Sequence, residues 1–143
     1  MSKVEILNID LTTKLELPFI NSGLVAGFPS PAQDYIEQSI DLNKELIKNP
    51  TTTFFGRVTG ESMKDAGINQ GDVIIIDKSL EISNNKIAVC YIDGEFTIKK
   101  VKLDKKKNEI WLMPANKDFQ PIKITAQNDF LVWGIVTYII KKM

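Results

Sequence analysis

One serine stands in a stretch of small and polar residues, T-G-E-S-M-K-D-A-G-I, that leads into an apolar run. Ser62 has the setting of a nucleophile presented on a turn, so the question is what could activate it. The chain contains no histidine, which excludes a Ser-His-Asp triad and a Cys-His dyad. Lysine is the remaining side chain that commonly activates a serine. The alternative is a turn serine whose hydroxyl only satisfies a backbone group.

A lysine base must be uncharged, although the ordinary pKa of its amine is about 10.4. Burial in apolar surroundings can lower that pKa by about 3 units, which corresponds to roughly 4 kcal/mol of lost solvation. The base must therefore lie on a packed element, and the segment G-E-F-T-I-K-K-V-K-L supplies the candidates. On a strand, Lys99 shares its face with uncharged neighbours, whereas Lys100 shares its face with Lys102. The pattern favours Lys99 and leaves Lys100 open, because Phe96 and Ile98 lie on the Lys100 face.

Other lysines are poorer candidates. Lys64 is too close to Ser62 along the chain to face it. The segment Ser83-Asn84-Asn85-Lys86 has the S-x-x-K spacing of penicillin-binding enzymes, but that spacing works on a helix and this stretch reads as a polar turn. The cluster formed by Lys100, Lys102, Lys105, Lys106 and Lys107 is expected to be a solvated strand end and turn.

The composition excludes several classes of site. With no histidine and only Cys90, the usual zinc sites and an intrachain disulfide cannot form. Neither a phosphate-binding loop nor a dinucleotide fingerprint occurs, so we expect no metal and no cofactor. Cys90 lies in the run I-A-V-C-Y and is expected to be a small core residue.

Charge and hydropathy indicate a soluble globular protein. Eighteen basic residues balance eighteen acidic ones, so nothing pulls the whole chain toward nucleic acid or an anionic membrane. The N-terminal stretch mixes charges into its apolar residues and reads as neither a signal peptide nor a membrane span. We expect a cytoplasmic protein.

The elements that must position Ser62 and the lysine are mostly strands. The β-favouring runs are T-F-F-G-R-V-T-G, D-V-I-I-I-D, E-I-W-L-M-P-A-N, D-F-L-V-W-G-I-V-T-Y-I-I-K-K, and a pair around Asp93-Gly94 that predicts a hairpin. D-Y-I-E-Q-S-I could be strand or helix, and a short helix is expected after Asp41 as its N-cap, with Pro50 as a stop. The fold class is therefore mostly β, compact and largely antiparallel, with one short helix.

The first part of the chain is expected to be separate from this core. Residues 1–33 show weak periodicity and end in Gly23-Leu24-Val25-Ala26-Gly27-Phe28-Pro29-Ser30-Pro31, where the prolines favour an extended backbone. We expect residues 1–33 to be a mobile or loosely docked N-terminal arm, and residues 34–143 to be the core.

Three stretches together resemble the LexA/UmuD family of self-cleaving serine peptidases: G-E-S-M-K-D-A-G-I, G-D-V-I-I-I-D and D-G-E-F-T-I-K-K. The resemblance implies a compact β peptidase fold in which Ser62 is the nucleophile and Lys99 the general base. Lys100 falls on the following, non-catalytic position. A-G-F-P-S-P-A is similar to the cleavage region of the family, which implies a scissile bond between Ala26 and Gly27. The similarity covers roughly residues 21–143.

The UmuD branch is expected rather than the repressor branch, because 26 residues are too few for a helix-turn-helix domain before the scissile bond. The backbone N–H groups of Ser62 and Met63 are expected to bind the oxyanion. The resemblance further implies a homodimer, stimulation by RecA–single-stranded DNA filaments after DNA damage, and a cleaved core that assists a UmuC-type Y-family polymerase. Sequence-specific DNA binding is not expected. Two alternatives stay open: a non-catalytic polymerase-binding subunit, and the regulatory domain of a phage-type repressor.

Overall fold

The computed structural model describes residues 3–7, 16–20 and 36–143, and these fall into two units. Residues 3–7 and 49–143 form one unit, which contains the Ser62 turn. Residues 16–20 and 36–48 form the other. Among the described residues, no helix is long and apolar enough to cross a membrane.

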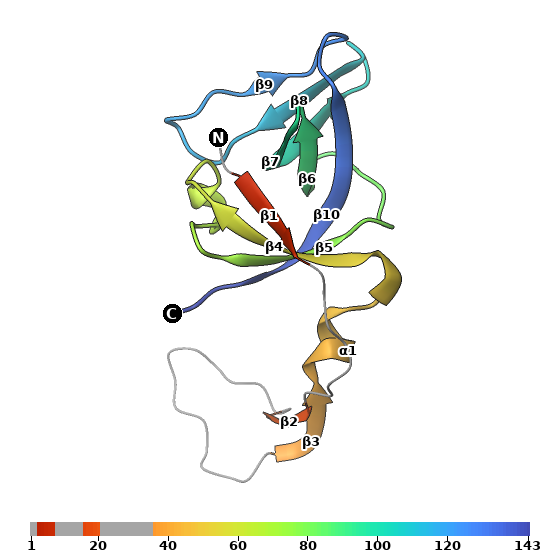
Figure 1. Ribbon diagram of the computed structural model, residues 1–143, viewed down its shortest axis with the longest axis vertical. Helices are drawn as coiled ribbons and strands as arrows, with labels where there is room; N and C mark the ends of the chain where they lie inside the picture. The colour runs from red at the N-terminus through yellow and green to blue at the C-terminus, as the bar shows by residue number, and fades with distance from the viewer. Residues whose placement is uncertain (1–2, 8–15, 21–35) are drawn as a thin grey trace. The chain divides into compact units, whose positions relative to one another are not determined.

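The first unit is built on one antiparallel sheet that curls back on itself (Figure 1). β1 (Lys3–Leu7) pairs with β4 (Thr53–Thr59) along its length and also meets β7 (Glu95–Asp104), where Lys3 lies opposite Thr97. It therefore joins two strands from distant parts of the sheet. In spatial order the strands are β1 (Lys3–Leu7), β4 (Thr53–Thr59), β5 (Val73–Asp77), β10 (Phe130–Ile140), β6 (Ile87–Ile92), β7 (Glu95–Asp104), β8 (Glu109–Met113) and β9 (Ile122–Lys123). The prediction of a mostly β, largely antiparallel fold is confirmed.

The longest strand, β10, allows the sheet to curl because it changes partner along its length. Its first half pairs with β6 and its second half with β5, with register shifts between Val132 and Gly134 and between Val136 and Tyr138. Bulges of this kind bend a strand and increase its twist. A Cβ on Gly134 would lie 2.5 Å from Cγ2 of Ile76, so only glycine lets the two strands approach this closely.

The β6–β7 hairpin carries Lys99, and it forms as the sequence predicts. Asp93 and Gly94 have φ values of 48° and 92°, as the two central residues of a type I′ turn require. The turn sets the register in which Ala88 lies opposite Lys99 and Cys90 opposite Thr97. Apolar residues on β6 and β7 are completely buried in two core clusters, the first including Val89 and Ile98 and the second Ala88, Cys90 and Val101.

The structure differs from the expectation of a loosely docked arm at β1. Val4 is buried and Glu5 exposed, which is the alternation of a half-buried strand. Gly56 on β4 leaves room for Val4, since a Cβ there would lie 2.5 Å from Cγ1 of Val4. Five residues with two charges were too short a pattern to identify as a strand. The division into an arm of residues 1–33 and a core of residues 34–143 stays a prediction.

The second unit contains a two-stranded antiparallel pair, β2 (Glu16–Ile20) and β3 (Ile36–Asp41), followed by α1 (Leu42–Leu46). Residues 36–40 of the ambiguous stretch before Asp41 are thus a strand. Asp41 caps the helix as predicted, because its Oδ1 accepts a hydrogen bond of 3.0 Å from the backbone N–H of Asn43. Two 3₁₀ turns, η1 (Pro50–Thr52) and η2 (Lys64–Ala66), belong to the first unit.

Candidate active site

Ser62 lies in a short turn between β4 and η2. Gly60 takes the left-handed conformation, with φ of 90°, and lets the chain reverse directly after β4. Ser62 and Met63 are both completely buried. The carbonyl of Met63 accepts hydrogen bonds from the N–H groups of Ala66 and Ile68, at 3.0 and 3.2 Å. The Met63 side chain and these bonds anchor the turn, so Ser62 is held by a fixed backbone.

Lys99 is a buried lysine near the middle of β7. Its side chain is 1% exposed, while Lys100 is only partly buried and Lys102 is exposed. The two same-face neighbours, Thr97 and Val101, are completely buried. Lys99 is thus the buried lysine of the pair, as the alternation argument favoured, although Ile98 on the Lys100 face is also completely buried.

The two predicted residues meet inside the first unit. Nζ of Lys99 lies 2.7 Å from Oγ of Ser62, although 37 residues separate them along the chain. The same nitrogen lies 3.1 Å from the Thr97 hydroxyl and 3.1 Å from the carbonyl oxygen of Ile98. A neutral amine has two N–H donors and one lone pair. It can donate to Ile98 and Thr97 while it accepts the Ser62 hydroxyl proton, which is the arrangement a general base needs.

Burial lowers the pKa of Lys99 from 10.5 to about 8, with a smaller opposing effect from the neighbouring Cys90 thiol. Burial also raises the pKa of Cys90 to about 12, so this thiol stays uncharged near neutral pH. Desolvation disfavours the ammonium, and no carboxylate is among the causes that act on Lys99. At pH 7 about a tenth of the molecules then carry a neutral amine at this position.

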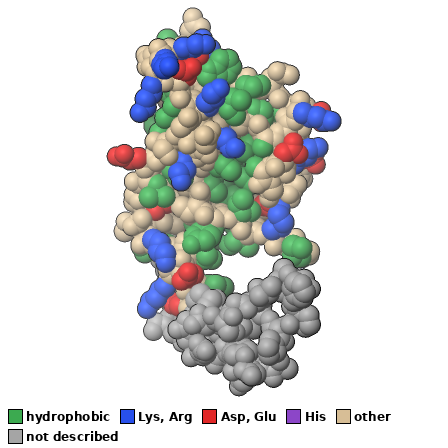
Figure 2. All heavy atoms as spheres, turned by 180° about the vertical axis from the view of Figure 1, so that it is seen from behind, with side chains coloured by type: hydrophobic (Ala, Val, Ile, Leu, Met, Phe, Trp, Pro, Cys, Tyr) green, Lys and Arg blue, Asp and Glu red, His purple; other side chains and the backbone are tan. Residues whose placement is uncertain are grey.

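The other lysines, the S-x-x-K stretch and Cys90 have the environments that the sequence predicts. Lys64, Lys105, Lys106 and Lys107 are exposed, and Figure 2 shows basic side chains spread over the visible face. The S-x-x-K stretch is a turn, with the N–H of Lys86 bonded to the carbonyl of Ser83 at 3.2 Å. Cys90 is completely buried, as expected.

Some residues at the site carried no sequence signal of their role. Thr97 is one of the uncharged residues on the face of Lys99, and its hydroxyl contacts the amine. Ala115 and Asn116, in the loop after β8, hydrogen-bond to the Ser62 turn from another part of the chain. No local spacing indicates that contact, because it arises only when the sheet curls.

Two further predictions concern the oxyanion donors and the scissile bond. The N–H groups of Ser62 and Met63 belong to the turn after β4, and their role as oxyanion donors stays a prediction. Ala26 and Gly27 lie outside the described residues. Within the part of the chain that the structure describes, no group of three or more His, Cys, Asp or Glu residues could hold a metal ion.

A buried serine hydroxyl beside a desolvated lysine amine can support acyl transfer without histidine. The family model described as Peptidase S24-like matches residues 18–137, which is most of the chain and includes both Ser62 and Lys99. The chain belongs to the S24 peptidase family. The resemblance seen in the sequence is confirmed at this level, and the assignment to UmuD itself stays a prediction.

Three relatives of this S24 chain are similar to it over most of their own length. Protein MucA of Salmonella typhimurium is 42% identical over 123 residues, covering 85% of this chain and 82% of MucA. Protein SamA of Salmonella typhimurium strain LT2 is 38% identical over 125 residues, covering 87% and 85%. Protein ImpA of Shigella flexneri is 38% identical over 117 residues, covering 82% and 78%.

Proposed function

We propose that this S24 protein is a serine endopeptidase that cuts its own chain between Ala26 and Gly27. Neutral Lys99 takes the proton of Ser62 as Oγ attacks the carbonyl carbon of Ala26. The N–H groups of Ser62 and Met63 bind the resulting oxyanion. Collapse of this intermediate breaks the Ala26–Gly27 bond, and the Lys99 ammonium gives its proton to the departing amine of Gly27.

The second half of the reaction regenerates the serine. Ala26 is now held as an ester on Ser62, and Lys99 is again neutral. Lys99 takes a proton from water as the water oxygen attacks the ester carbonyl, and then returns that proton to Oγ as the ester bond breaks. The products are a peptide of residues 1–26 and a core of residues 27–143.

The observation that carries the proposal is the 2.7 Å contact between Nζ of Lys99 and Oγ of Ser62, with both side chains almost completely removed from solvent. A charged lysine in such a place would usually be paired with a carboxylate. Here its polar neighbours are two hydroxyls and a carbonyl. Such neighbours orient an amine, but without a carboxylate they offset only part of the cost of its charge.

The experiment is incubation of the purified protein at mildly alkaline pH, followed by intact-mass measurement over time. The wild type is expected to give masses for residues 1–26 and 27–143. Ser62→Ala and Lys99→Arg are expected to stay whole, because arginine does not release its proton. Ser83→Ala and Lys86→Arg are the matched controls, since they change the other serine–lysine pair in an exposed turn. Cutting by Lys99→Arg at the wild-type rate would remove Lys99 as the base.

We further propose that this cleavage belongs to SOS mutagenesis. The support is membership of the S24 family, the similarity to MucA, SamA and ImpA, and the UmuD-like cleavage segment. A RecA–single-stranded DNA filament would stabilise the state in which the cleavage segment is docked and the amine is dry, which is a population shift rather than new chemistry. The cleaved homodimeric core would then act with a UmuC-type Y-family polymerase.

Two measurements separate this role from that of a non-catalytic subunit. Activated RecA filament should raise the cleavage rate of the wild type and leave Ser62→Ala whole. The cleaved protein should bind a UmuC-type polymerase more tightly than Ser62→Ala does. Equal binding by the two would indicate that polymerase binding does not depend on cleavage. Failure to shift operator DNA is expected in every form, and specific binding to an operator would favour the repressor alternative.

A further inference from the structure

The loop that follows β8 makes a set of hydrogen bonds to the chain on both sides of Ser62. The N–H of Ala115 donates to the carbonyl of Ser62 at 2.8 Å, and its carbonyl accepts from the N–H of Asp65 at 2.7 Å. The side chain of Asn116 donates from Nδ2 to the carbonyl of Glu61 at 2.9 Å. Two successive carbonyls of the turn are thereby bonded to one short segment.

These two carbonyls belong to the peptide groups that contain the proposed oxyanion donors. The carbonyl of Glu61 shares its peptide plane with the N–H of Ser62. The carbonyl of Ser62 shares its plane with the N–H of Met63. In a planar trans peptide the C=O and N–H bonds point in opposite directions, and the described residues contain no cis peptide bond. Fixing the direction of each carbonyl therefore fixes the direction of the N–H on the other side of the same plane.

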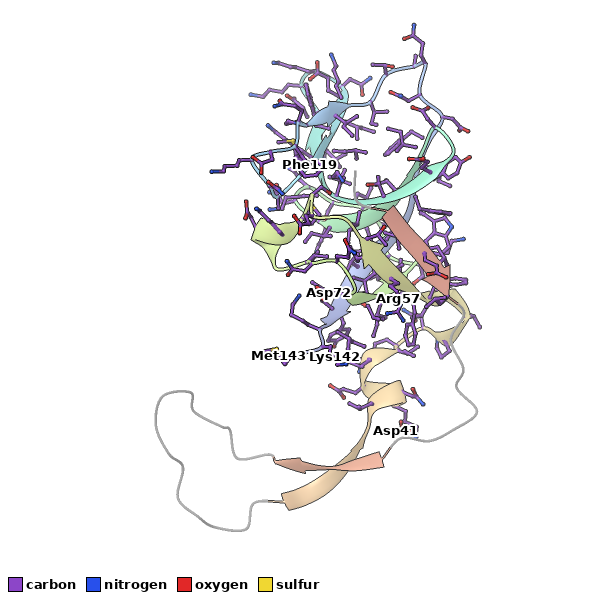
Figure 3. All side chains as sticks on the ribbon, turned by 60° about the vertical axis from the view of Figure 1, so that its left-hand side comes forward. Asp41, Arg57, Asp72, Phe119, Lys142 and Met143 are labelled. Carbon is purple, nitrogen blue, oxygen red and sulfur yellow. The ribbon has the colours of Figure 1, made fainter. Side chains whose placement is uncertain are left out.

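Asn116 is itself firmly held. Asn116 is only 6% exposed. Its side-chain Oδ1 accepts a hydrogen bond of 2.9 Å from the N–H of Asp118, and its backbone carbonyl accepts one of 3.1 Å from the N–H of Phe119. Figure 3 labels Phe119, in the loop that follows Asn116. Both ends of the Asn116 amide are engaged, so the group that reaches Glu61 has a fixed orientation. The backbone of Ala115 holds the Ser62–Met63 peptide. The side chain of Asn116 holds the Glu61–Ser62 peptide, so the orientation of that peptide depends on this side chain.

We propose that Asn116 is a positioning residue that aims the N–H of Ser62 at the oxyanion of the tetrahedral intermediate. The inference rests on the proposed function, because it assumes that Ser62 forms such an intermediate. The hydrogen bonds of Asn116 run to Glu61, Asp118 and Phe119. It acts through the peptide plane alone. A loss of its amide donor should therefore lower the rate of acyl transfer without changing the pKa of Lys99.

The test compares Asn116→Ala with Asn128→Ala. Asn128 is a matched control, because its Oδ1 also accepts from a nearby backbone N–H, that of Thr125, and its Nδ2 also reaches another segment, at Asp93. Asn116→Asp is the second variant: it keeps an acceptor for the N–H of Asp118 but has no donor for the carbonyl of Glu61. Self-cleavage is followed by intact mass across pH, at a temperature where thermal melts show every variant folded. Labelling of Ser62 by diisopropyl fluorophosphate is measured in parallel.

Asn116→Ala and Asn116→Asp are expected to cleave and to label at least tenfold more slowly than wild type, since removal of one oxyanion donor costs roughly 100-fold or more in other serine peptidases. The pH midpoint of Asn116→Ala cleavage should equal that of wild type. Asn128→Ala should cleave within twofold of wild type. A rate within twofold of wild type for both Asn116 variants, or a rate loss in Asn128→Ala of the same size, would overturn the inference. If the wild type itself neither cleaves nor labels, the proposed function fails instead.

Discussion

The hydroxyl of Thr97 lies 3.1 Å from Nζ of Lys99, two residues along the same face of β7. Opposite Thr97 on β6 is Cys90, which is completely buried and whose thiol stays protonated because burial raises its pKa to about 12. Lys99 therefore has one neighbour that hydrogen-bonds to its amine and another that is buried close by, and neither carries a charge near neutral pH. This relationship explains how the strand can orient a lysine amine and still leave it ready to lose its proton.

The rate of self-cleavage should follow the deprotonation of Lys99. Because burial lowers the pKa of Lys99 to about 8, the rate should rise about tenfold for each pH unit below pH 8 and level off above it. The measurement is the single-turnover rate of residue 1–26 release between pH 6 and 10. A rate that keeps rising to pH 10 or beyond would mean that the amine titrates at its ordinary pKa.

Replacement of Thr97 by valine keeps the shape of the side chain and removes the hydroxyl. The ammonium form of Lys99 would lose one hydrogen-bond acceptor, so its pKa should fall further and the pH–rate curve should shift toward lower pH. The plateau rate should also fall, because the amine loses part of its orientation. Thr137→Val serves as the control, since Thr137 bonds to the carbonyl of Ile75 on β5. An unchanged midpoint in Thr97→Val would show that this hydroxyl does not stabilise the charged amine.

The buried lysine should also shape the pH dependence of stability. The folded-state pKa of Lys99 is about 8 and the ordinary value is 10.5, so between these pH values the unfolded chain binds more protons than the folded chain. The free energy of unfolding should therefore rise with pH across this window by about 3 kcal/mol from this group, and this contribution is lost as pH falls through 8. Urea denaturation of the wild type and of Lys99→Met at several pH values measures this contribution, as the difference between the two free energies of unfolding.

The comparison with Lys99→Met is needed because Cys90 has the opposite effect on the pH dependence of stability. Its folded-state pKa is raised from 9.0 to about 12, so its contribution to stability is lost as pH rises from 9. Cys90 is present in both proteins, and its effect largely cancels in the difference. Parallel curves for wild type and Lys99→Met between pH 8 and 10.5 would contradict a lowered pKa at Lys99.

The packing of β1 against β4 can be tested by substitution of Gly56. A Cβ there would lie 2.5 Å from Cγ1 of Val4 and 3.1 Å from side-chain atoms of Ile74 and Ile76, so Gly56→Ala should destabilise the protein by about 1–3 kcal/mol. Val4→Ala removes the closest atom. The double variant should therefore lose less stability than the sum of the two single variants in urea denaturation. Simple additivity would mean that Val4 does not lie against Gly56.

The sequence by itself determined the chemistry that the site can perform and the local elements that carry it. The absence of histidine left lysine as the candidate activator of Ser62, and the two-residue period of a strand favoured Lys99 while it left Lys100 open. The Asp93-Gly94 turn and the Asp41 cap could also be predicted, because each depends on residues close together in the chain.

Only the tertiary structure decided which distant groups meet. The curl of the sheet brings β7 to the turn after β4, and it places Lys99 Nζ 2.7 Å from Ser62 Oγ. The same curl lays Asn116 against Glu61 and β1 against β7. Contacts of this kind depend on strand order and on bulges such as those in β10, which are set by packing across the whole sheet. The lowered pKa of Lys99 has the same origin, because it depends on burial by residues from several strands rather than on its neighbours in sequence.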